Sequence, residues 1–178
     1  MGLDLTSGKP CIIPTFLGAH AFPPEFSDDL DGYMDLLCDE MIPAVGEQGI
    51  AQYCDVFCEK GYFSVEQSRR ILETGKTYGL IPRLHADEFE DSGAAELAAE
   101  VGAVSADHLM AVSSAGISAL KNGAVTATLL PGTTFFLGKQ SYAPAEKLTE
   151  AGISIALATD FNPGSSHLQS IPFMISLA

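Results

Sequence analysis

Three residues that directly follow apolar stretches carry side chains able to bind a metal or move a proton. They are His85 in RLHADEF, His108 in SADHL and Asp160 in ATDFNPG. Imidazole and carboxylate groups suit Zn²⁺ or a similar ion, which lowers the pKa of a bound water. Glu88 lies three residues past His85 and adds a carboxylate for proton transfer. Spacing alone leaves two interpretations open, a metal-dependent hydrolase or strand-end histidines that only satisfy hydrogen bonds.

The four cysteines do not form a recognised site. Cys54 and Cys58 are four residues apart, but the stretch AQYCDVFCEK predicts a strand, in which that spacing is about 13 Å. Because Cys11 and Cys38 add no C-x-x-C pair and four cysteines are too few for a disulfide scaffold, we expect buried free thiols in a reducing cytoplasm.

The elements that must position these side chains follow one repeated pattern. A polar, helix-like stretch ends in glycine, and an apolar strand of about six to ten residues follows it. Glycine is the usual left-handed stop of a helix because it lacks a Cβ. The strands show little polar alternation, as expected for parallel strands covered on both faces. The five glycines are Gly49, Gly79, Gly102, Gly123 and Gly152.

Helix signals separate the predicted strands. Ser64 and Gln67 fit a capping box, and residues 93–101 and 143–151 are further helix candidates. CIIPTFLGAHA supplies one more buried strand before the first repeat. The sequence therefore predicts six strands alternating with helices, an α/β fold.

The positions of the polar residues favour a barrel over an open sheet. No G-x-G-x-x-G or Walker A motif marks a nucleotide-binding sheet. His20, His85, His108 and Asp160 each end a different predicted strand, and in a barrel these ends converge on one mouth. Six strands do not close an eight-stranded barrel of about 250 residues. We expect residues 1–178 to form a single, incomplete TIM (β/α)8 barrel domain.

Charge and composition exclude several function classes. The 178 residues include 23 acidic and nine basic ones, a formal net charge of −14 with no local basic stripe, so nucleic-acid binding is not expected. No run of about 18 apolar residues predicts a membrane span, and no secretory signal opens the sequence. The remaining expectation is a cytoplasmic protein with a small-molecule substrate.

Six stretches, in unbroken order, resemble the imidazolonepropionase family of the amidohydrolase superfamily. They are TFLGAHAFPPEF, DVFCEKGYFSVEQSRRIL, GLIPRLHADEF, GAAELAAEVGAVSADHL, LLPGTTFFLG and ALATDFNPGSS. The resemblance covers essentially the whole chain, and its last motif is specific to this family. It implies a hydrolase acting on C–N bonds in cyclic amides. The implied reaction is the opening of 4-imidazolone-5-propanoate to N-formimidoyl-L-glutamate in histidine degradation.

The same resemblance implies roles for individual residues. His85 on strand five and Asp160 on strand eight would ligate one Zn²⁺ or Fe³⁺ ion, and Asp160 would also accept a proton from water. Glu88 would contact the substrate ring and shuttle protons. His108 on strand six would hydrogen-bond the ring carbonyl, and His20 would meet the substrate.

The motif after strand eight is implied to hold the polar end of the substrate. Asn162, Gly164 and Ser165 belong to this loop, where a glycine lets backbone N–H groups approach an anion. His167, one turn further on, is expected to be a surface histidine and receives no role.

The sequence also departs from the family pattern. The family begins with a small β domain and a barrel strand carrying H-x-H, followed by a substrate-binding Arg and Tyr, and this sequence has none of these. We therefore expect strands 3–8 without strands 1–2 and without the small β domain. The isolated chain should bind metal weakly, show no measurable turnover and expose two strand edges. The apolar segment IPFMISLA and the family both favour a homodimer.

Two alternatives stay open at this point. One is another amidohydrolase, either a cyclic amidase or a deaminase, which shares the strand-end His and Asp but acts on a different ring. The other is a non-catalytic barrel fragment that serves as a binding or assembly module.

Overall fold

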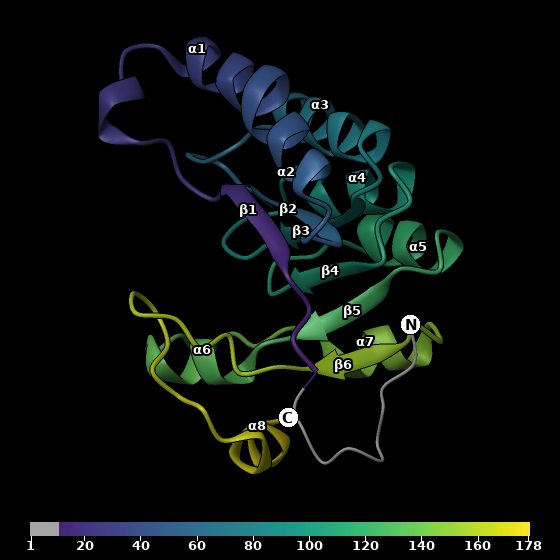
Figure 1. Cartoon of the computed structure of the whole chain (residues 1–178). Coiled ribbons are helices and arrows are strands. Elements are labelled where there is room, and N and C mark those ends of the chain that lie inside the picture. The colour runs from purple at the N-terminus through teal and green to yellow at the C-terminus, as the bar shows by residue number, and fades with distance from the viewer. Residues whose placement is uncertain (1–10) are drawn as a thin grey trace.

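The structure is a computed structural model that describes residues 11–178, and its centre is one parallel sheet. Within the described residues six strands are hydrogen-bonded in the order β1-β2-β3-β4-β5-β6 (Figure 1). Each neighbouring pair is parallel. All six strands predicted from the sequence are present, although they are shorter than expected. Their bounds are Thr15–Ala19, Tyr53–Cys58, Ile81–Ala86, Ser105–His108, Thr126–Leu129 and Ile155–Leu157.

Helices connect the consecutive strands, as the repeated pattern predicts. Between β1 and β2 lie η1 (Pro24–Phe26), α1 (Leu30–Asp35), the π-helical η2 (Leu36–Met41) and α2 (Ile42–Gln48). The next crossovers are α3 (Val65–Thr77), α4 (Ala94–Glu100) and α5 (Ser114–Asn122). Then α6 (Pro131–Phe136) and α7 (Ala145–Glu150) precede β6, and α8 (Ile171–Leu177) follows it.

The predicted capping box starts α3. The Ser64 hydroxyl accepts a hydrogen bond from the Gln67 backbone N–H at 3.3 Å, and the Gln67 side chain accepts one from the Ser64 backbone N–H at 2.9 Å. Two N–H groups that the first turn would leave unpaired are thereby satisfied. The capped helix packs on β2 and β3 and so holds the two strands that lead into the cavity described below.

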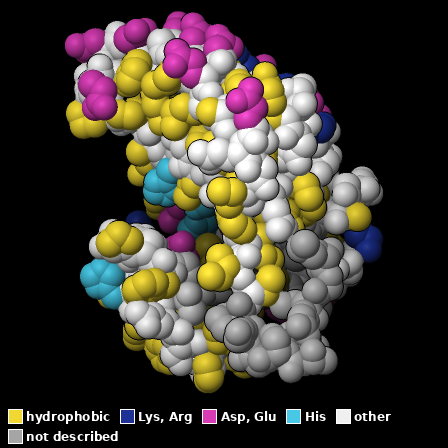
Figure 2. Space-filling view, in the orientation of Figure 1, with side chains coloured by type: hydrophobic (Ala, Val, Ile, Leu, Met, Phe, Trp, Pro, Cys, Tyr) yellow, Lys and Arg dark blue, Asp and Glu magenta, His cyan; other side chains and the backbone are white. Residues whose placement is uncertain are grey.

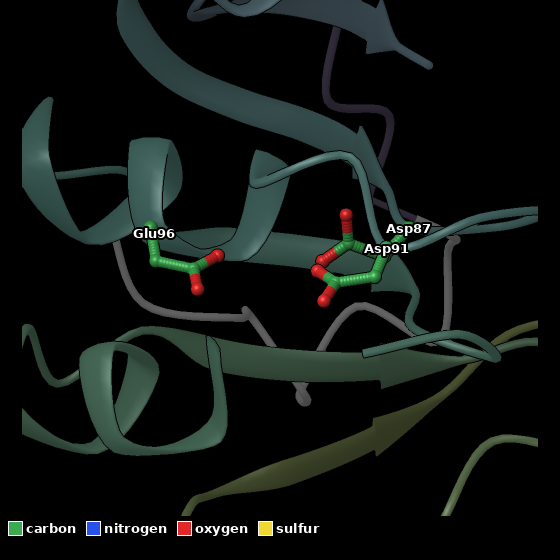
Figure 3. A group of neighbouring side chains, drawn as sticks. All are labelled: Asp87, Asp91 and Glu96. Atoms are coloured by element: carbon green, nitrogen blue, oxygen red, sulfur yellow. The ribbon is translucent and has the colours of Figure 1, made fainter. Parts of the chain in front are cut away.

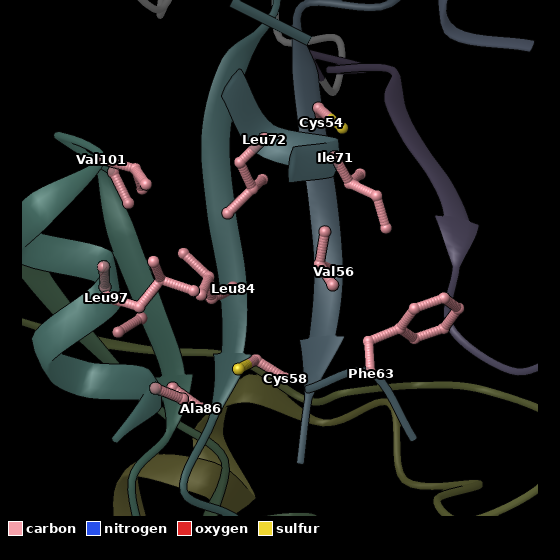
Figure 4. Close-up of a cluster of buried hydrophobic side chains, with 14 of the residues drawn as sticks. Cys54, Val56, Cys58, Phe63, Ile71, Leu72, Leu84, Ala86, Leu97 and Val101 are labelled. Atoms are coloured by element: carbon pink, nitrogen blue, oxygen red, sulfur yellow. The ribbon is translucent and has the colours of Figure 1, made fainter. Parts of the chain in front are cut away.

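The hydrophobic core lies between the sheet and its crossover helices (Figure 4). Val56 of β2 and Leu84 of β3 are fully buried, as are Ile71 and Leu72 of α3 and Ala98 of α4. Each large aliphatic side chain buried in this way contributes roughly 1.5–3 kcal/mol relative to exposure. This layer determines which way every second strand residue must face.

The opposite face of the sheet is polar, which the sequence analysis did not predict. Asp55 and Phe57 alternate with the core residues of β2, and Arg83 and His85 alternate with those of β3. These side chains line a cavity instead of packing under a second layer. The expectation of strands with little polar alternation was therefore wrong for β2 and β3, because their inner face meets a site and not a second apolar layer.

Four of the five predicted glycine stops are left-handed, and one is not. Gly49, Gly79, Gly102 and Gly152 have positive φ, whereas Gly123 has φ −79° and the left-handed residue is its neighbour Ala124, with φ 53°. The presence of glycine at position 123 is explained by helix packing and not by a left-handed turn. A Cβ at this position would lie 2.9 Å from the Cβ of Ala99, so the glycine allows α5 to approach α4.

The sheet has two unpaired edges among the described residues. β1 and β6 each pair with one neighbour, and both expose apolar side chains, with Leu17 at 40% and Ile155 at 37%. Cys11, which the sequence analysis expected to be buried, is exposed, because β1 begins only at Thr15. The arrangement is that of an incomplete parallel α/β barrel. None of the helices in residues 11–178 is long and apolar enough to cross a membrane.

Candidate active site

One cavity of about 740 Å³ opens at the carboxyl ends of the strands. It corresponds to the hollow in Figure 2 where histidine and acidic side chains gather. All eight residues singled out from the sequence line it, so the structure brings together side chains that lie as far apart in the sequence as His20 and Ser165. They are His20, His85, Glu88, His108, Asp160, Asn162, Gly164 and Ser165.

His85 is held from the sheet side by a carboxylate. Its Nδ1 lies 2.9 Å from Oδ1 of Asp55, and the two side chains are 14% and 5% exposed. Burial lowers the pKa of His85, but the charge and hydrogen bond of Asp55, with smaller contributions from the charges of Asp107 and Asp160, together outweigh it, and the pKa rises to about 9. Because Nδ1 is engaged, Nε2 is the ring nitrogen that can give up its proton and bind a ligand.

The other two histidines of the cavity, His20 and His108, flank His85. The ring centroid of His20 is 5.5 Å from that of His85, and the centroid of His108 is 5.3 Å from it on another side. Burial, with a smaller contribution from the two neighbouring imidazoles, lowers the pKa of His108 to about 3. His108 is therefore a neutral imidazole near pH 7, able to donate a hydrogen bond without carrying charge.

Glu88 faces this histidine group from the loop after β3. One of its carboxylate oxygens, Oε2, is 3.6 Å from Nε2 of His108, and the residue is 7% exposed. Burial raises the pKa of Glu88 to about 7, partly offset by the positive charge of His85 and increased by Asp160. A carboxyl group with this pKa can both take up and release a proton near neutral pH.

Left-handed backbone at the strand ends brings two of these residues to the cavity. His108 has φ 75° and Asp160 has φ 51°. Alternation along β4 would send the residue after Asp107 toward the helix layer, and the change of backbone conformation instead lets His108 line the cavity. Non-glycine residues in this region are uncommon and cluster at functional sites, because their strain must be supported by the surrounding structure.

The loop after Asp160 is organised by Asn162. Its Oδ1 accepts hydrogen bonds from the backbone N–H groups of Gly164 at 2.9 Å and Ser165 at 2.7 Å, and its Nδ2 donates to the Asp160 carbonyl at 2.7 Å. The two N–H groups expected to meet an anion are thus bonded to Asn162 in this structure. His167 is exposed, as expected for a surface histidine.

Three cavity residues were missed by the sequence analysis. Asp55 contacts His85, and a terminal guanidinium nitrogen of Arg83 donates to Oδ2 of Asp107 at 2.8 Å. The available signal was a charged residue two positions from another non-aliphatic residue of the same strand, as in D-V-F, R-L-H and S-A-D. Such spacing places both side chains on the same face of a strand.

The donor atoms fit part of a metal site. His85 offers Nε2 with a carboxylate behind Nδ1, the arrangement that commonly orients a metal-ligating histidine. Asp160 offers the carboxylate oxygen that is not bonded to Thr133. Catalytic zinc sites usually have three protein ligands, so the pair supplies two of the ligands that such a site needs.

A second acidic group lies outside the cavity. Carboxylate oxygens of Asp87, Asp91 and Glu96 approach one another closely (Figure 3). Asp87 accepts hydrogen bonds from the backbone N–H groups of Ala94 and Ala95, at 3.2 Å each. Asp87 therefore serves the start of α4, and we assign no ligand to this group.

Comparison with known proteins finds imidazolonepropionases among the similar sequences. An imidazolonepropionase from Geobacillus kaustophilus is 56% identical over 167 residues, which are 94% of this chain and 39% of that protein. One from Bacteroides fragilis is 54% identical over 94% of the chain, and one from Alkaliphilus metalliredigens is 49% identical over 98% of it. This chain is thus similar, over nearly all of its length, to one part of the imidazolonepropionases. It spans about two fifths of the length of these relatives, 39% to 42%. No protein-family model matches the chain.

Solved structures confirm the fold expected for the imidazolonepropionase family. A guanine deaminase from C. acetobutylicum superposes with a TM-score of 0.68 at 17% identity, over 93% of this chain and 43% of that one. A 5-methylcytosine deaminase from Klebsiella pneumoniae gives 0.63 at 18% identity, over 89% and 44%. An adenosine deaminase from Xanthomonas campestris, with bound zinc, gives 0.56 at 17% identity, over 79% and 35%. At these identities the likeness concerns the fold alone, a partial amidohydrolase-type barrel.

Proposed function

We propose that this chain carries the substrate-binding and proton-transfer half of an imidazolonepropionase. The proposed reaction is the hydrolytic opening of 4-imidazolone-5-propanoate to N-formimidoyl-L-glutamate, in histidine degradation. The observation that supports it most is the identity of 49–56% to imidazolonepropionases over nearly the whole chain. The grouping of the eight predicted site residues around one cavity is consistent with it.

His108 and His20 are proposed to bind the substrate ring. A neutral His108 can donate a hydrogen bond to the ring carbonyl, and this bond strengthens as the carbonyl oxygen gains negative charge. His20 stacks on Phe57 at a centroid distance of 5.4 Å, which gives its ring a defined orientation at the cavity wall. Asn162 is proposed to act through the loop it organises, with Gly164 and Ser165 beside the polar end of the substrate.

Glu88 is proposed as the proton shuttle. Its carboxylate can take a proton from the attacking water and deliver it to the ring nitrogen when the C–N bond breaks. A pKa near the working pH favours both transfers, and burial supplies that pKa. The 3.6 Å approach to His108 places the shuttle next to the group that would hold the carbonyl.

His85 and Asp160 are proposed to hold one metal ion, either Zn²⁺ or Fe³⁺. When bound, such an ion activates water and polarises the bond under attack. Asp160 also offers a carboxylate as a proton acceptor. We propose that the remaining ligands come from the part of the longer relatives that this chain does not match.

Further proposals concern the setting of residues 1–178. We propose that they form one barrel domain of a cytoplasmic enzyme with a small-molecule substrate, without nucleic acid or membrane as partner. The acidic net charge of −14 supports the exclusion of nucleic acid. A homodimer is proposed from the apolar side chains that α8 exposes, with Ile175 at 62% and Ile171 at 45%.

A chimera tests the function directly. In the Geobacillus kaustophilus imidazolonepropionase, the matching 167 residues are replaced by those of this chain, and ring opening of 4-imidazolone-5-propanoate is followed by absorbance. We expect metal-dependent turnover by the chimera and none by the 178-residue chain alone, because two ligands do not complete a site. A folded, metal-loaded chimera without turnover would contradict the proposal.

A pair of variants in the chimera tests the proton shuttle. Glu88→Gln should lower kcat by about 100-fold or more, the usual scale of general acid–base catalysis. Glu90→Gln is the matched control, since Glu90 is exposed and pairs with Lys60 outside the cavity. Equal effects of the two substitutions would remove Glu88 from this role.

A panel of cyclic amides and amino-heterocycles, assayed with the chimera, separates this substrate from those of other amidohydrolases.

A further inference from the structure

Asp55 is a buried carboxylate with a single side-chain partner among the described residues. It lies in the middle of β2, is 4% exposed, and has its Oδ1 2.9 Å from Nδ1 of His85 on the neighbouring strand. No basic side chain of the described chain forms an ion pair with it apart from His85. Burial of a carboxylate without a specific partner is costly, so the contact with His85 accounts for its presence here.

A second buried carboxylate next to His85 has a different partner. Asp107 is directly opposite His85 in the β3–β4 register and is 6% exposed. Its Oδ2 accepts a hydrogen bond from the Arg83 guanidinium at 2.8 Å. Thus each of the two strands that neighbour β3 carries a buried carboxylate, and only that of Asp55 contacts the His85 imidazole.

The contact with Asp55 limits both the orientation and the tautomer of the His85 ring. A carboxylate at Nδ1 requires a proton on Nδ1, so in the neutral ring the lone pair is on Nε2. Phe57 packs against the ring with a centroid distance of 5.5 Å, and His20 meets it edge-on at 5.5 Å. In the described part of the chain Nε2 has no hydrogen-bond partner, and His85 lines the cavity.

We propose that Asp55 is the positioning residue of the site, which fixes the proton on Nδ1 of His85 and presents Nε2 to a metal ion in the cavity. The metal part of this inference rests on the proposed function, whereas the contact and the tautomer do not. Partners of this kind typically change metal affinity by about 10–100-fold when they are removed.

The test uses the 178-residue chain labelled with ¹⁵N-histidine. The Nδ1-bound proton and the ring nitrogens of His85 are observed by NMR without metal and during titration with Zn²⁺. Asp55→Ala removes the acceptor, and Asp55→Asn keeps the shape and an acceptor oxygen should the alanine variant fail to fold. Asp107→Asn is the matched control, since it alters a buried carboxylate of the same cavity that does not touch His85.

We expect the wild-type chain and the Asp107→Asn variant to show a His85 Nδ1 proton protected from exchange, and Asp55→Ala to lose it. The apparent Zn²⁺ dissociation constant at Nε2 should rise by about tenfold or more in Asp55→Ala, less in Asp55→Asn and little in the control. Retention of the protected proton in Asp55→Ala, or equal loss of affinity in the control, overturns the inference. Loss of the proton with no Zn²⁺ response in any chain supports the fixed tautomer of His85 and overturns the part of the inference that presents Nε2 to a metal ion, while the metal site of the proposed function is tested separately in the chimera.

Discussion

The Thr133 hydroxyl donates a hydrogen bond to Oδ2 of Asp160 across 2.6 Å. Thr133 is 1% exposed and lies in α6, so the carboxylate after β6 is fixed by a helix that precedes that strand. A buried hydroxyl that meets a carboxylate forms a short, charge-assisted hydrogen bond. With Asp55 behind His85, both proposed metal ligands thus have a buried partner on another element.

Thr133→Val should impair the site more than it impairs the fold. The substitution keeps the shape and removes the donor, so we expect a loss of about 1–2 kcal/mol in the free energy of unfolding and about tenfold weaker metal binding in the chimera. Thr134→Val is the control, because Thr134 is equally buried but its hydroxyl contacts the sulfur of Met110. Urea unfolding and metal titration measure the two effects. If both variants lose metal affinity equally, Thr133 has no specific role toward Asp160.

The low pKa of His108 predicts a specific loss of stability in acid. Its folded-state pKa is about 3 against 6.5 for the ordinary imidazole, so between these values the unfolded chain binds a proton that the folded chain does not. Stability from this group is complete above pH 6.5 and falls as the pH decreases, by at most about 1.4 kcal/mol per pH unit.

His108→Gln should remove this part of the pH dependence. In urea unfolding with a chelator present, the variant should lose less stability between pH 7 and pH 5 than the wild-type chain. His167→Gln serves as the control, since His167 is exposed. An unchanged pH slope in His108→Gln would show that the imidazole is not held neutral by burial.

Thiol labelling should distinguish the cysteines by burial. Burial raises the pKa of Cys54 to about 12 and that of Cys58 to about 11, and it also raises the pKa of Cys38. The thiolate is the reactive form and its fraction falls as the pKa rises, so these three should resist iodoacetamide at pH 8. Cys11 is exposed and should react. Mass spectrometry should show one label on the native chain and four labels on the urea-unfolded chain. Rapid labelling of Cys54 in the native chain would contradict its burial in the hydrophobic core.

Substitutions at two neighbouring residues at the end of α5 should change the stability of the fold in opposite directions. In Gly123→Ala the new Cβ meets Ala99 atoms at 2.9 and 3.0 Å, and such overpacking costs about 1–3 kcal/mol. In Ala124→Gly the left-handed strain at φ 53° is relieved. Glycine also loses more backbone entropy on folding, and the net result should be a stabilisation of the fold by about 0.5–1 kcal/mol. Thermal unfolding of both variants measures the signs. A stabilising Gly123→Ala would show that α4 and α5 are further apart than the structure has them.

Local sequence signals were sufficient for the order of elements. The capping box at Ser64, the six strands and the helices near residues 93–101 and 143–151 were all predicted, because each depends on neighbours within a few positions. The signals failed where a distant contact decides the conformation. Gly123 is such a case, since a glycine is needed there because of the close approach of Ala99 on another helix and not because of the local helix stop.

The sequence by itself determined the likeness to imidazolonepropionases and the residues that end the strands, because motifs such as HADEF and TDFNPGSS persist in linear order. The tertiary structure alone decided the environment of those residues. The Asp55 carboxylate behind His85, the Thr133 hydroxyl on Asp160 and the burial that shifts the pKa values of Glu88 and His108 join segments about 20 to 30 positions apart or depend on the whole cavity. Hydrogen bonds and desolvation depend on distance in space, and that distance exists only once the strands are in register.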